Sequence, residues 1–237
     1  MRQAWSGPSS QTLLPAKATG QGRQDLRAQA DLKRVTALSP AEVEACLRTA
    51  GHQLIAGVDE VGRGSLAGPV VAAAVILPAS CVIQGVKDSK ALSARRREQL
   101  DLAIRAEAIG VGFGVIQEEV IDAINILQAT MLAMRRAIDA LNPPPDFILI
   151  DGDQSPHCSI PHRLIPSGDR LCFSISAASI VAKVARDRIM QAYDLALPQY
   201  GFSQHKGYGT SEHLTAIARF GVSPIHRKSF KGVREHV

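Results

Sequence analysis

Apolar residues fall into short runs along the chain, and the spacing of these runs predicts strands and helices in alternation. Residues 53–61 and 68–77 are rich in Val, Ile and Ala, which is typical of strands buried on both faces of a sheet. The glycine-rich segment between them predicts a turn, so the two strands should form a hairpin. Shorter apolar runs predict further strands at 111–116, 146–151 and 162–166.

Other segments carry the periodicity or the end signals of helices. The sequence SPAE at 39–42 predicts a helix start, because it offers a capping serine, a first-turn proline and a glutamate that can reach back to the cap. Residues 118–141 place an apolar residue every three or four positions, which predicts one long amphipathic helix ended by prolines. The remaining predicted helices are 94–108, capped by Ser93, then 174–196, and a helix that Ser211 caps and Gly221 ends.

The order of these elements predicts an α/β fold, because strands come first and helices interleave with later strands around a mixed sheet. The 237 residues are 46% hydrophobic, enough for one sizeable core, and only 4% aromatic, so that core should be aliphatic. We expect a disordered tail at 1–38, rich in Gln, Gly, Ser and Ala, and a core at 39–197. Residues 198–237 should form a basic helical segment that packs on the core.

Composition and charge narrow the class of protein. No apolar run reaches the roughly 18 residues of a membrane span, and the N-terminus lacks the apolar stretch of a secretory signal. The absence of such a span predicts a soluble protein, and four cysteines without a CxxC pair are typical of a reduced, cytoplasmic one. We also expect a monomer. The net charge is +5, and residues 201–237 carry six Lys or Arg against two acids, which favours a polyanionic partner.

Acidic residues stand at the ends of several predicted strands. Asp59 lies near the mouth of the hairpin turn, Asp151 ends the strand FILID, and Asp169 follows the next strand after a glycine. Carboxylates that converge at one edge of a sheet repel one another unless a cation is bound, and oxygen ligands favour Mg²⁺ or Mn²⁺. Two such ions hydrolyse phosphodiesters, one generating the nucleophile and the other stabilising the leaving oxygen.

The stretch GVDEVGRG at 57–64 is similar to the sequence motif of a phosphate-binding P-loop, but it differs at the two positions that bind phosphate and metal in that loop. Arg63 and Gly64 stand where that loop needs Lys and then Ser or Thr. Asp59 and Glu60 are adjacent in the same stretch, and successive side chains of a regular strand point to opposite faces. Asp59 and Glu60 can share one site only if the strand ends or bulges there, and for a single acid a cap, turn or surface role stays open.

Several motifs occur in a fixed order along the chain. They are DEVGRG at 59–64, DSK at 88–90, LIDGD at 149–153, SGD at 167–169, SAASIVAKVARD at 176–187 and QHKGYGT at 204–210. Together they resemble type 2 ribonuclease H (ribonuclease HII), from about residue 53 to residue 231. The resemblance implies a ribonuclease H-like mixed sheet flanked by helices, with a small C-terminal helical segment. It also implies an endonuclease that cuts the RNA strand of RNA–DNA hybrids and incises DNA duplexes 5′ to a single embedded ribonucleotide, leaving 3′-OH and 5′-phosphate.

The resemblance assigns roles to individual residues. The implied ligands of two Mg²⁺ or Mn²⁺ ions, and hence the catalytic residues, are Asp59, Glu60, Asp151 and Asp169. The backbone of Gly62, Arg63 and Gly64 would sense the ribose 2′-hydroxyl, since a Cβ on a glycine would block close approach. Tyr208 would stack near the RNA–DNA junction and help to read the 2′-hydroxyl. Lys90 and Lys183 would contact phosphates.

Two other functions compete with this interpretation. Another nuclease or recombinase on the same fold would cut an all-DNA duplex or act without a 2′-hydroxyl. A non-catalytic hybrid-binding module would lack one of the acids, and none is missing from this sequence. One departure from the family is Ser167, which stands where many relatives have Lys and which concerns a phosphate contact rather than the metal site.

Basic residues near the C-terminus should clasp the duplex. These are Lys206, Arg219, Arg227, Lys228, Lys231 and Arg234. The histidines of the same region, His205 and His226, should be structural or close to phosphate rather than metal ligands.

Overall fold

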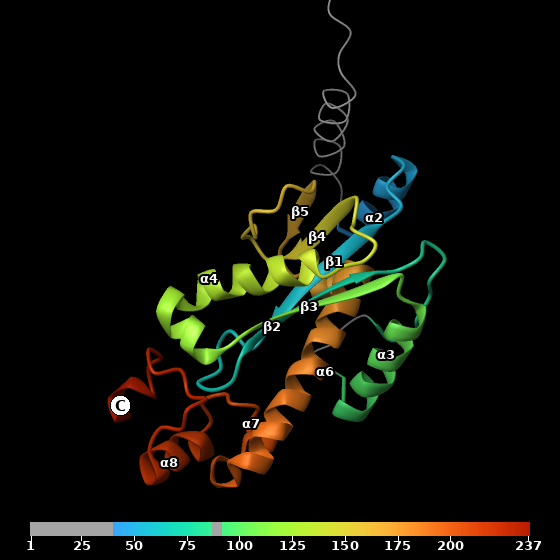
Figure 1. Ribbon diagram of the computed structural model, residues 1–237. Coiled ribbons are helices and arrows are strands. Elements are labelled where there is room, and N and C mark those ends of the chain that lie inside the picture. Colours follow the sequence, from blue (N-terminus) through green and yellow to red (C-terminus); the bar gives the residue numbers. More distant parts are fainter. Residues whose placement is uncertain (1–39, 87–91) are drawn as a thin grey trace, which may run out of the picture.

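The computed structural model describes residues 40–86 and 92–237, and at its centre is a five-stranded sheet of order β3-β2-β1-β4-β5 (Figure 1). The strands are β1 (Ile55–Val61), β2 (Val70–Ile76), β3 (Gly110–Ile116), β4 (Phe147–Asp151) and β5 (His162–Ile165). β2 runs antiparallel to β1 and β3, whereas β4 runs parallel to β1 and β5, so the sheet is mixed. The predicted strands and the predicted hairpin are therefore confirmed, with strand ends shifted by at most two residues.

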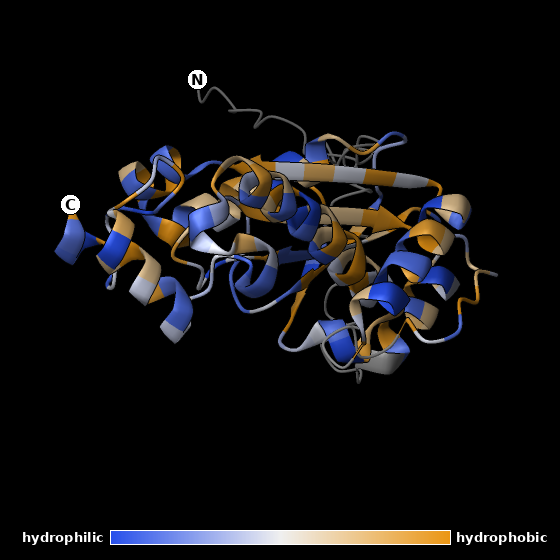
Figure 2. Cartoon of the chain, turned by 90° about the horizontal axis from the view of Figure 1, so that it is seen from below, coloured by the Kyte–Doolittle hydropathy of each residue, from blue (hydrophilic) through white to orange (hydrophobic). Residues whose placement is uncertain are grey.

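Helices cover both faces of this sheet, which confirms the predicted α/β fold (Figure 1). One face packs on α4 (Glu118–Asp139), and the other on α3 (Ala94–Glu107) and α6 (Phe173–Ala196). α2 (Pro40–Thr49) packs beside α6. The shorter elements are α5 (Gly168–Leu171), η1 (Pro198–Tyr200), α7 (Phe202–His205), α8 (Ser211–Phe220) and η2 (Arg234–His236). Figure 2 shows mainly hydrophobic strands among helices with alternating hydrophobic and hydrophilic stripes, as a layered aliphatic core requires.

The predicted tail at 1–38 and the predicted phosphate contact Lys90 lie outside the described residues. In the part of the chain that is described, every helix is too short or too polar to traverse a lipid bilayer.

The long predicted helix at 118–141 is broken near its start. Asn125 in α4 has φ 67° and ψ 164°, so two helical pieces meet at a kink. The side-chain Oδ1 of Asn125 accepts hydrogen bonds from the N–H groups of Leu127 and Gln128, at 3.0 and 3.1 Å. Asparagine tolerates positive φ and caps the second piece, whereas the apolar periodicity continues through the break and conceals it.

The predicted helix caps are right at one helix and wrong at another. Ser93 caps α3, since its Oγ accepts a hydrogen bond from the N–H of Arg96 at 3.3 Å. At α8 the cap is Thr210 rather than the predicted Ser211, because the Thr210 hydroxyl accepts from the N–H of His213. Both residue types suit a cap, so the sequence alone could not choose between two adjacent candidates.

Gly57 in β1 lets α6 approach the sheet directly, because a Cβ there would lie 2.1 Å from the backbone carbonyl carbon of Ser174. We expect Gly57→Ala to lower the free energy of unfolding by about 1–3 kcal/mol, since overpacking forces the helix away from the strand. Urea unfolding followed by circular dichroism measures this change. Gly64→Ala is the matched control, because a Cβ there meets no atom within 4 Å. Equal stability of the two variants would contradict the close helix–strand contact.

Candidate active site

Three of the four predicted acids line one pocket at the end of the central strands. The pocket has a volume of about 290 Å³, and its walls include Asp59, Glu60 and Asp151. β1 and β4 run parallel with Val58 opposite Ile150, so Asp59 and Asp151 occupy the next position on each strand. Side chains at matching positions of parallel strands point to the same face, which here is the face covered by α6.

Glu60 reaches the same pocket although strand alternation directs it to the opposite face of β1. No bulge is responsible, because β1 pairs with β2 without interruption as far as Val61 opposite Val71. Pairing with β4 stops at Val58, and β4 itself ends at Asp151. The edge of β1 beyond that point is open on this side, so the long Glu60 side chain can bend around it. The end of the neighbouring strand, rather than a bulge in β1, brings the adjacent acids together.

The three carboxylates disfavour one another's negative charge. Burial raises the pKa of Asp59 well above its ordinary value, and the negative charges of Glu60 and Asp151 raise it further. A hydrogen bond with Ser179 lowers this pKa but does not offset the rise. Burial also raises the pKa of Glu60, and Arg63 opposes this with Nη1 3.4 Å from Oε1 of Glu60. Asp59 is only 5% exposed. A bound divalent cation would relieve this repulsion, and the donors are the hard oxygens that Mg²⁺ and Mn²⁺ prefer.

Asp169 adjoins this cluster without lining the pocket. The residue is 2% exposed and follows Gly168, whose N–H donates to Oδ1 of Asp151 at 2.6 Å. Its own backbone carbonyl accepts a hydrogen bond from Ser176 at 2.7 Å. Over residues 40–86 and 92–237, no three His, Cys, Asp or Glu side chains form a ready-made metal site. The structure therefore brings the carboxylates of Asp59, Glu60 and Asp151 to one pocket and leaves Asp169 beside it.

Helix α6 forms another wall of the pocket and presents polar residues at four-residue spacing. Ser179 and Lys183 line the pocket, and Asp187 follows one turn later. Nζ of Lys183 lies 2.7 Å from Oδ1 of Asp187. Arg97 of α3 completes this side. Sequence reasoning missed Ser179 and Arg97, although Ser179 lies inside the motif SAAS and Arg97 inside a run of three arginines.

Comparison with known proteins decides the family. The family model described as ribonuclease HII matches residues 56–233. The chain belongs to the ribonuclease HII family. A ribonuclease HII from Geobacter sulfurreducens is 54% identical over 187 residues, which cover 79% of this chain and 86% of that relative. The protein is therefore a ribonuclease H enzyme, a nuclease of the hydrolase class.

Solved structures share the fold of this chain. Ribonuclease H2 from Pyrococcus horikoshii OT3 is similar with a TM-score of 0.65 and 26% identity, over 76% of this chain and 95% of that chain. Bst-RNase HIII in complex with Mn²⁺ is similar with a TM-score of 0.61 over 78% of this chain and 70% of that one. At 20% identity the second likeness shows the fold alone.

The β1–β2 loop, residues 62–69, is hydrogen-bonded on its inner side by two arginines that are 0% exposed. Arg186 of α6 donates hydrogen bonds to the carbonyls of Ala67, Pro69 and Lys206. Arg227 donates to the carbonyls of Arg63 and Gly68. The predicted duplex contact of Arg227 is therefore wrong. Burial lowers the pKa of Arg227 to about 9, so it keeps its charge at neutral pH.

Tyr208 stands where this loop meets the C-terminal segment. Tyr208 lines the acid pocket and is 37% exposed, and its ring centroid lies 5.7 Å from the guanidinium carbon of Arg186. Nδ1 of His213 lies 2.9 Å from the Tyr208 carbonyl, and Nε2 of His213 lies 3.0 Å from Nε2 of His226. Burial lowers the pKa of both histidines to about 4, so they are neutral at pH 7. Together with His205, whose Nε2 lies 2.8 Å from the Tyr200 carbonyl, they hold the Tyr208 turn.

Proposed function

We propose that this protein cleaves the RNA strand of RNA–DNA hybrids and incises duplex DNA on the 5′ side of a single embedded ribonucleotide. The products are a 3′-OH and a 5′-phosphate. The observation that carries the proposal is the pocket in which Asp59, Glu60 and Asp151 meet while burial and mutual repulsion raise the pKa of Asp59. The exposed side chain of Tyr208 lines the same pocket, and the glycine-containing loop 62–69 follows directly after Val61 in its wall, which suits a substrate with a sugar–phosphate backbone.

The acids would hold two Mg²⁺ or Mn²⁺ ions, and Asp169, beside Asp151, completes the proposed set of four. When bound, such ions activate water and stabilise the leaving oxygen of a phosphodiester. The surrounding residues orient these ligands. Ser179 hydrogen-bonds Asp59, and Arg63 pairs with Glu60. Mn²⁺ bound to Bst-RNase HIII, which shares this fold, is consistent with divalent-metal use.

The loop would recognise the ribose through its backbone. The carbonyl of Arg63 is turned inward to Arg227, at 2.9 Å from Nη1. The N–H groups of Arg63 and Gly64 donate no hydrogen bond to any described residue, and both residues are exposed. These groups can therefore donate to a 2′-hydroxyl oxygen, which a deoxyribose lacks. Tyr208 would contribute an aromatic surface on which the adjoining sugar stacks.

The deciding experiment compares three labelled duplexes: an RNA–DNA hybrid, a DNA duplex with one ribonucleotide, and an all-DNA duplex. With Mg²⁺ or Mn²⁺ we expect the first two to be cut, the second at the 5′ side of the ribonucleotide, and the third to stay intact. EDTA should stop all cleavage. Cutting of the all-DNA duplex would assign a different nuclease specificity, and undiminished cleavage in EDTA would exclude the metal mechanism.

Gly64→Ala tests ribose recognition without disturbing the fold, because a Cβ there meets no atom within 4 Å. We expect kcat/KM on the single-ribonucleotide duplex to fall about 10- to 100-fold, which corresponds to losing about 1–3 kcal/mol of a close polar contact. Affinity for the all-DNA duplex, measured in EDTA, should stay unchanged and serves as the internal control. Wild-type cleavage by this variant would show that the substrate does not approach Gly64 closely.

A further inference from the structure

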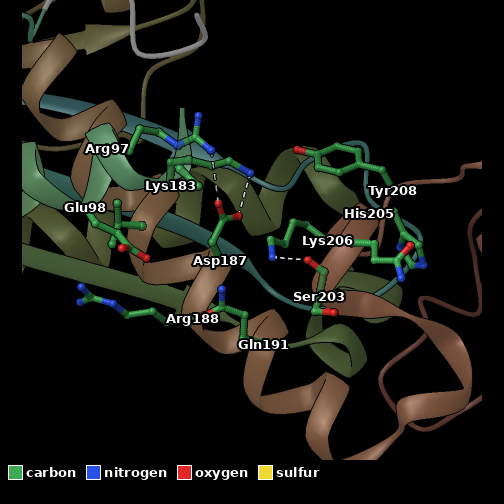
Figure 3. A pocket seen from close by; sticks show the side chains of 13 residues that line it. Arg97, Glu98, Lys183, Asp187, Arg188, Gln191, Ser203, His205, Lys206 and Tyr208 are labelled. Carbon is green, nitrogen blue, oxygen red and sulfur yellow. Dashed lines mark hydrogen bonds and ion pairs between the residues drawn. The ribbon is translucent and has the colours of Figure 1, made fainter. Parts of the chain in front are cut away.

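A second pocket, drawn in Figure 3, shares part of its wall with the acid pocket. It has a volume of about 450 Å³ and lies between α3, α6 and the turn around α7. Arg97, Lys183 and Tyr208 line both pockets. A nucleic-acid strand that binds at the acid pocket can therefore extend along the surface into the second pocket.

The two pockets carry opposite charge. The acid pocket holds three carboxylates and the two shared cations, Arg97 and Lys183, whereas the second pocket has four cationic side chains, those two included, and two acids. The cations are Arg97, Lys183, Arg188 and Lys206, and the acids are Glu98 and Asp187. A nucleic-acid strand carries a negative charge at every phosphate. A phosphate over the carboxylates needs bound metal ions, whereas a neighbouring phosphate over the second pocket would meet cations that the protein itself supplies.

Asp187 holds two of these cations at the junction between the pockets. Nζ of Lys183 lies 2.7 Å from Oδ1 of Asp187, and Nη2 of Arg97 lies 3.8 Å from Oδ2. Figure 3 shows Arg97 and Lys183 converging on Asp187, with the Tyr208 ring nearby. Arg97 is anchored further by a 2.5 Å hydrogen bond from Nη1 to the carbonyl of Leu92. Two cations share one carboxylate, so this fixed group retains a positive charge and loses little side-chain entropy when it binds an anion.

We propose that the second pocket is a phosphate subsite, in which Arg97 and Lys183 together bind a backbone phosphate of the substrate strand next to the one that is cleaved. Asp187 acts as the positioning residue that holds this pair. Lys206 borders the pocket from the α7 side, where its Nζ donates to the carbonyl of Ser203. The proposal rests on the proposed function. The family resemblance already implies a phosphate contact for Lys183. What the proposal adds is Arg97, which belongs to none of the motifs that resemble the family, and the positioning role of Asp187.

The chain offers a matched control in the residue next to Arg97. The guanidinium of Arg96 contacts the Gln84 carbonyl at 3.0 Å and the Gln99 side chain at 3.4 Å, and it lines neither pocket. The experiment measures the affinity for a fluorescent single-ribonucleotide duplex over a series of salt concentrations in EDTA, where no metal-dependent cleavage interferes. We expect Arg97→Ala to weaken binding about 10-fold and to reduce the slope of log K against log salt by about one. Arg96→Ala should leave both values unchanged.

Two further variants separate the charge of Arg97 from its structural hydrogen bond. Arg97→Lys keeps the charge and should retain the wild-type salt slope. Arg97→Gln removes the charge but keeps a donor, and it should behave like Arg97→Ala. A wild-type slope in Arg97→Gln or Arg97→Ala would overturn the subsite, as would an equal loss in Arg96→Ala.

Failure of the subsite can be told apart from failure of the proposed cleavage. Binding in EDTA reports the subsite alone, and the three-duplex cleavage assay reports the reaction. A wild-type protein that shows the expected slopes but cuts neither ribonucleotide-containing duplex would overturn the proposed function and support the subsite. Normal cleavage by the wild type, combined with a wild-type salt slope in Arg97→Ala and Arg97→Gln, would support the proposed function and overturn the subsite.

Discussion

Asp59→Asn should slow cleavage of a ribonucleotide-containing duplex about a thousandfold while making the metal-free protein more stable. The Asp59 carboxylate adjoins both Glu60 and Asp151, so its charge contributes to any ion that the cluster holds. Losing about 4 kcal/mol of transition-state stabilisation lowers the rate about a thousandfold. Single-turnover cleavage in Mg²⁺ measures this effect. Asp139→Asn is the matched control, because Asp139 lies on α4 and pairs with Arg135 on the surface. Wild-type turnover by Asp59→Asn would show that the site is elsewhere.

The gain in stability follows from the direction of the pKa shift. The folded protein holds the proton on Asp59 at a pH where the unfolded chain has released it, because the folded pKa is raised. Stability from this group is therefore fully present below the ordinary pKa, near 4, and is lost as the pH rises through the raised value. In EDTA, urea unfolding should show wild-type stability falling over that window and a shallower fall for Asp59→Asn. Added Mg²⁺ should stabilise the wild type more than the variant. A variant that is less stable than the wild type in EDTA at pH 7 would contradict the repulsion.

The strands of the sheet were predictable from the sequence because each one has a recognisable local pattern of apolar residues. A buried strand such as β2 is a continuous apolar run, and the glycines before it predict the hairpin. The kink in α4 was not predictable from periodicity, because its cause is the backbone conformation of the single residue Asn125. The order of the strands places β4 beside β1, and this pairing alone explains how Asp151 meets Asp59.

The acids of the site were predictable, but their geometry and their neighbours were not. Strand ends and the family motifs pointed to Asp59 and Asp151, whereas the access of Glu60 depends on where another strand stops. In the run of three arginines only the third lines the pockets, because the orientation of α3 selects it. Arg227 has the sequence context of a surface cation, yet its partners are carbonyls 159 and 164 positions away in the chain. A local pattern cannot show contacts at that separation.

Arg186→Met should lower the free energy of unfolding by about 3–5 kcal/mol, because it removes a fully buried donor from a polar network. The carbonyls of Ala67, Pro69 and Lys206 would lose hydrogen bonds of 2.9–3.1 Å, and the bonds to Ala67 and Pro69 lie in the buried interior. Glu118 would also lose one of its two cationic neighbours, although burial already raises its pKa. Urea unfolding at pH 7 measures the loss.

Arg188→Met is the control for this prediction, since it makes the same change two residues later on α6. Arg188 is 53% exposed and lies 3.6 Å from Asp101, so its replacement should cost less than about 1 kcal/mol. Equal losses for the two variants would mean that the buried hydrogen bonds of Arg186 do not hold the loop. If Arg186 does hold it, the remaining folded Arg186→Met protein should also cleave the single-ribonucleotide duplex more slowly, because the backbone of Gly64 loses its fixed position.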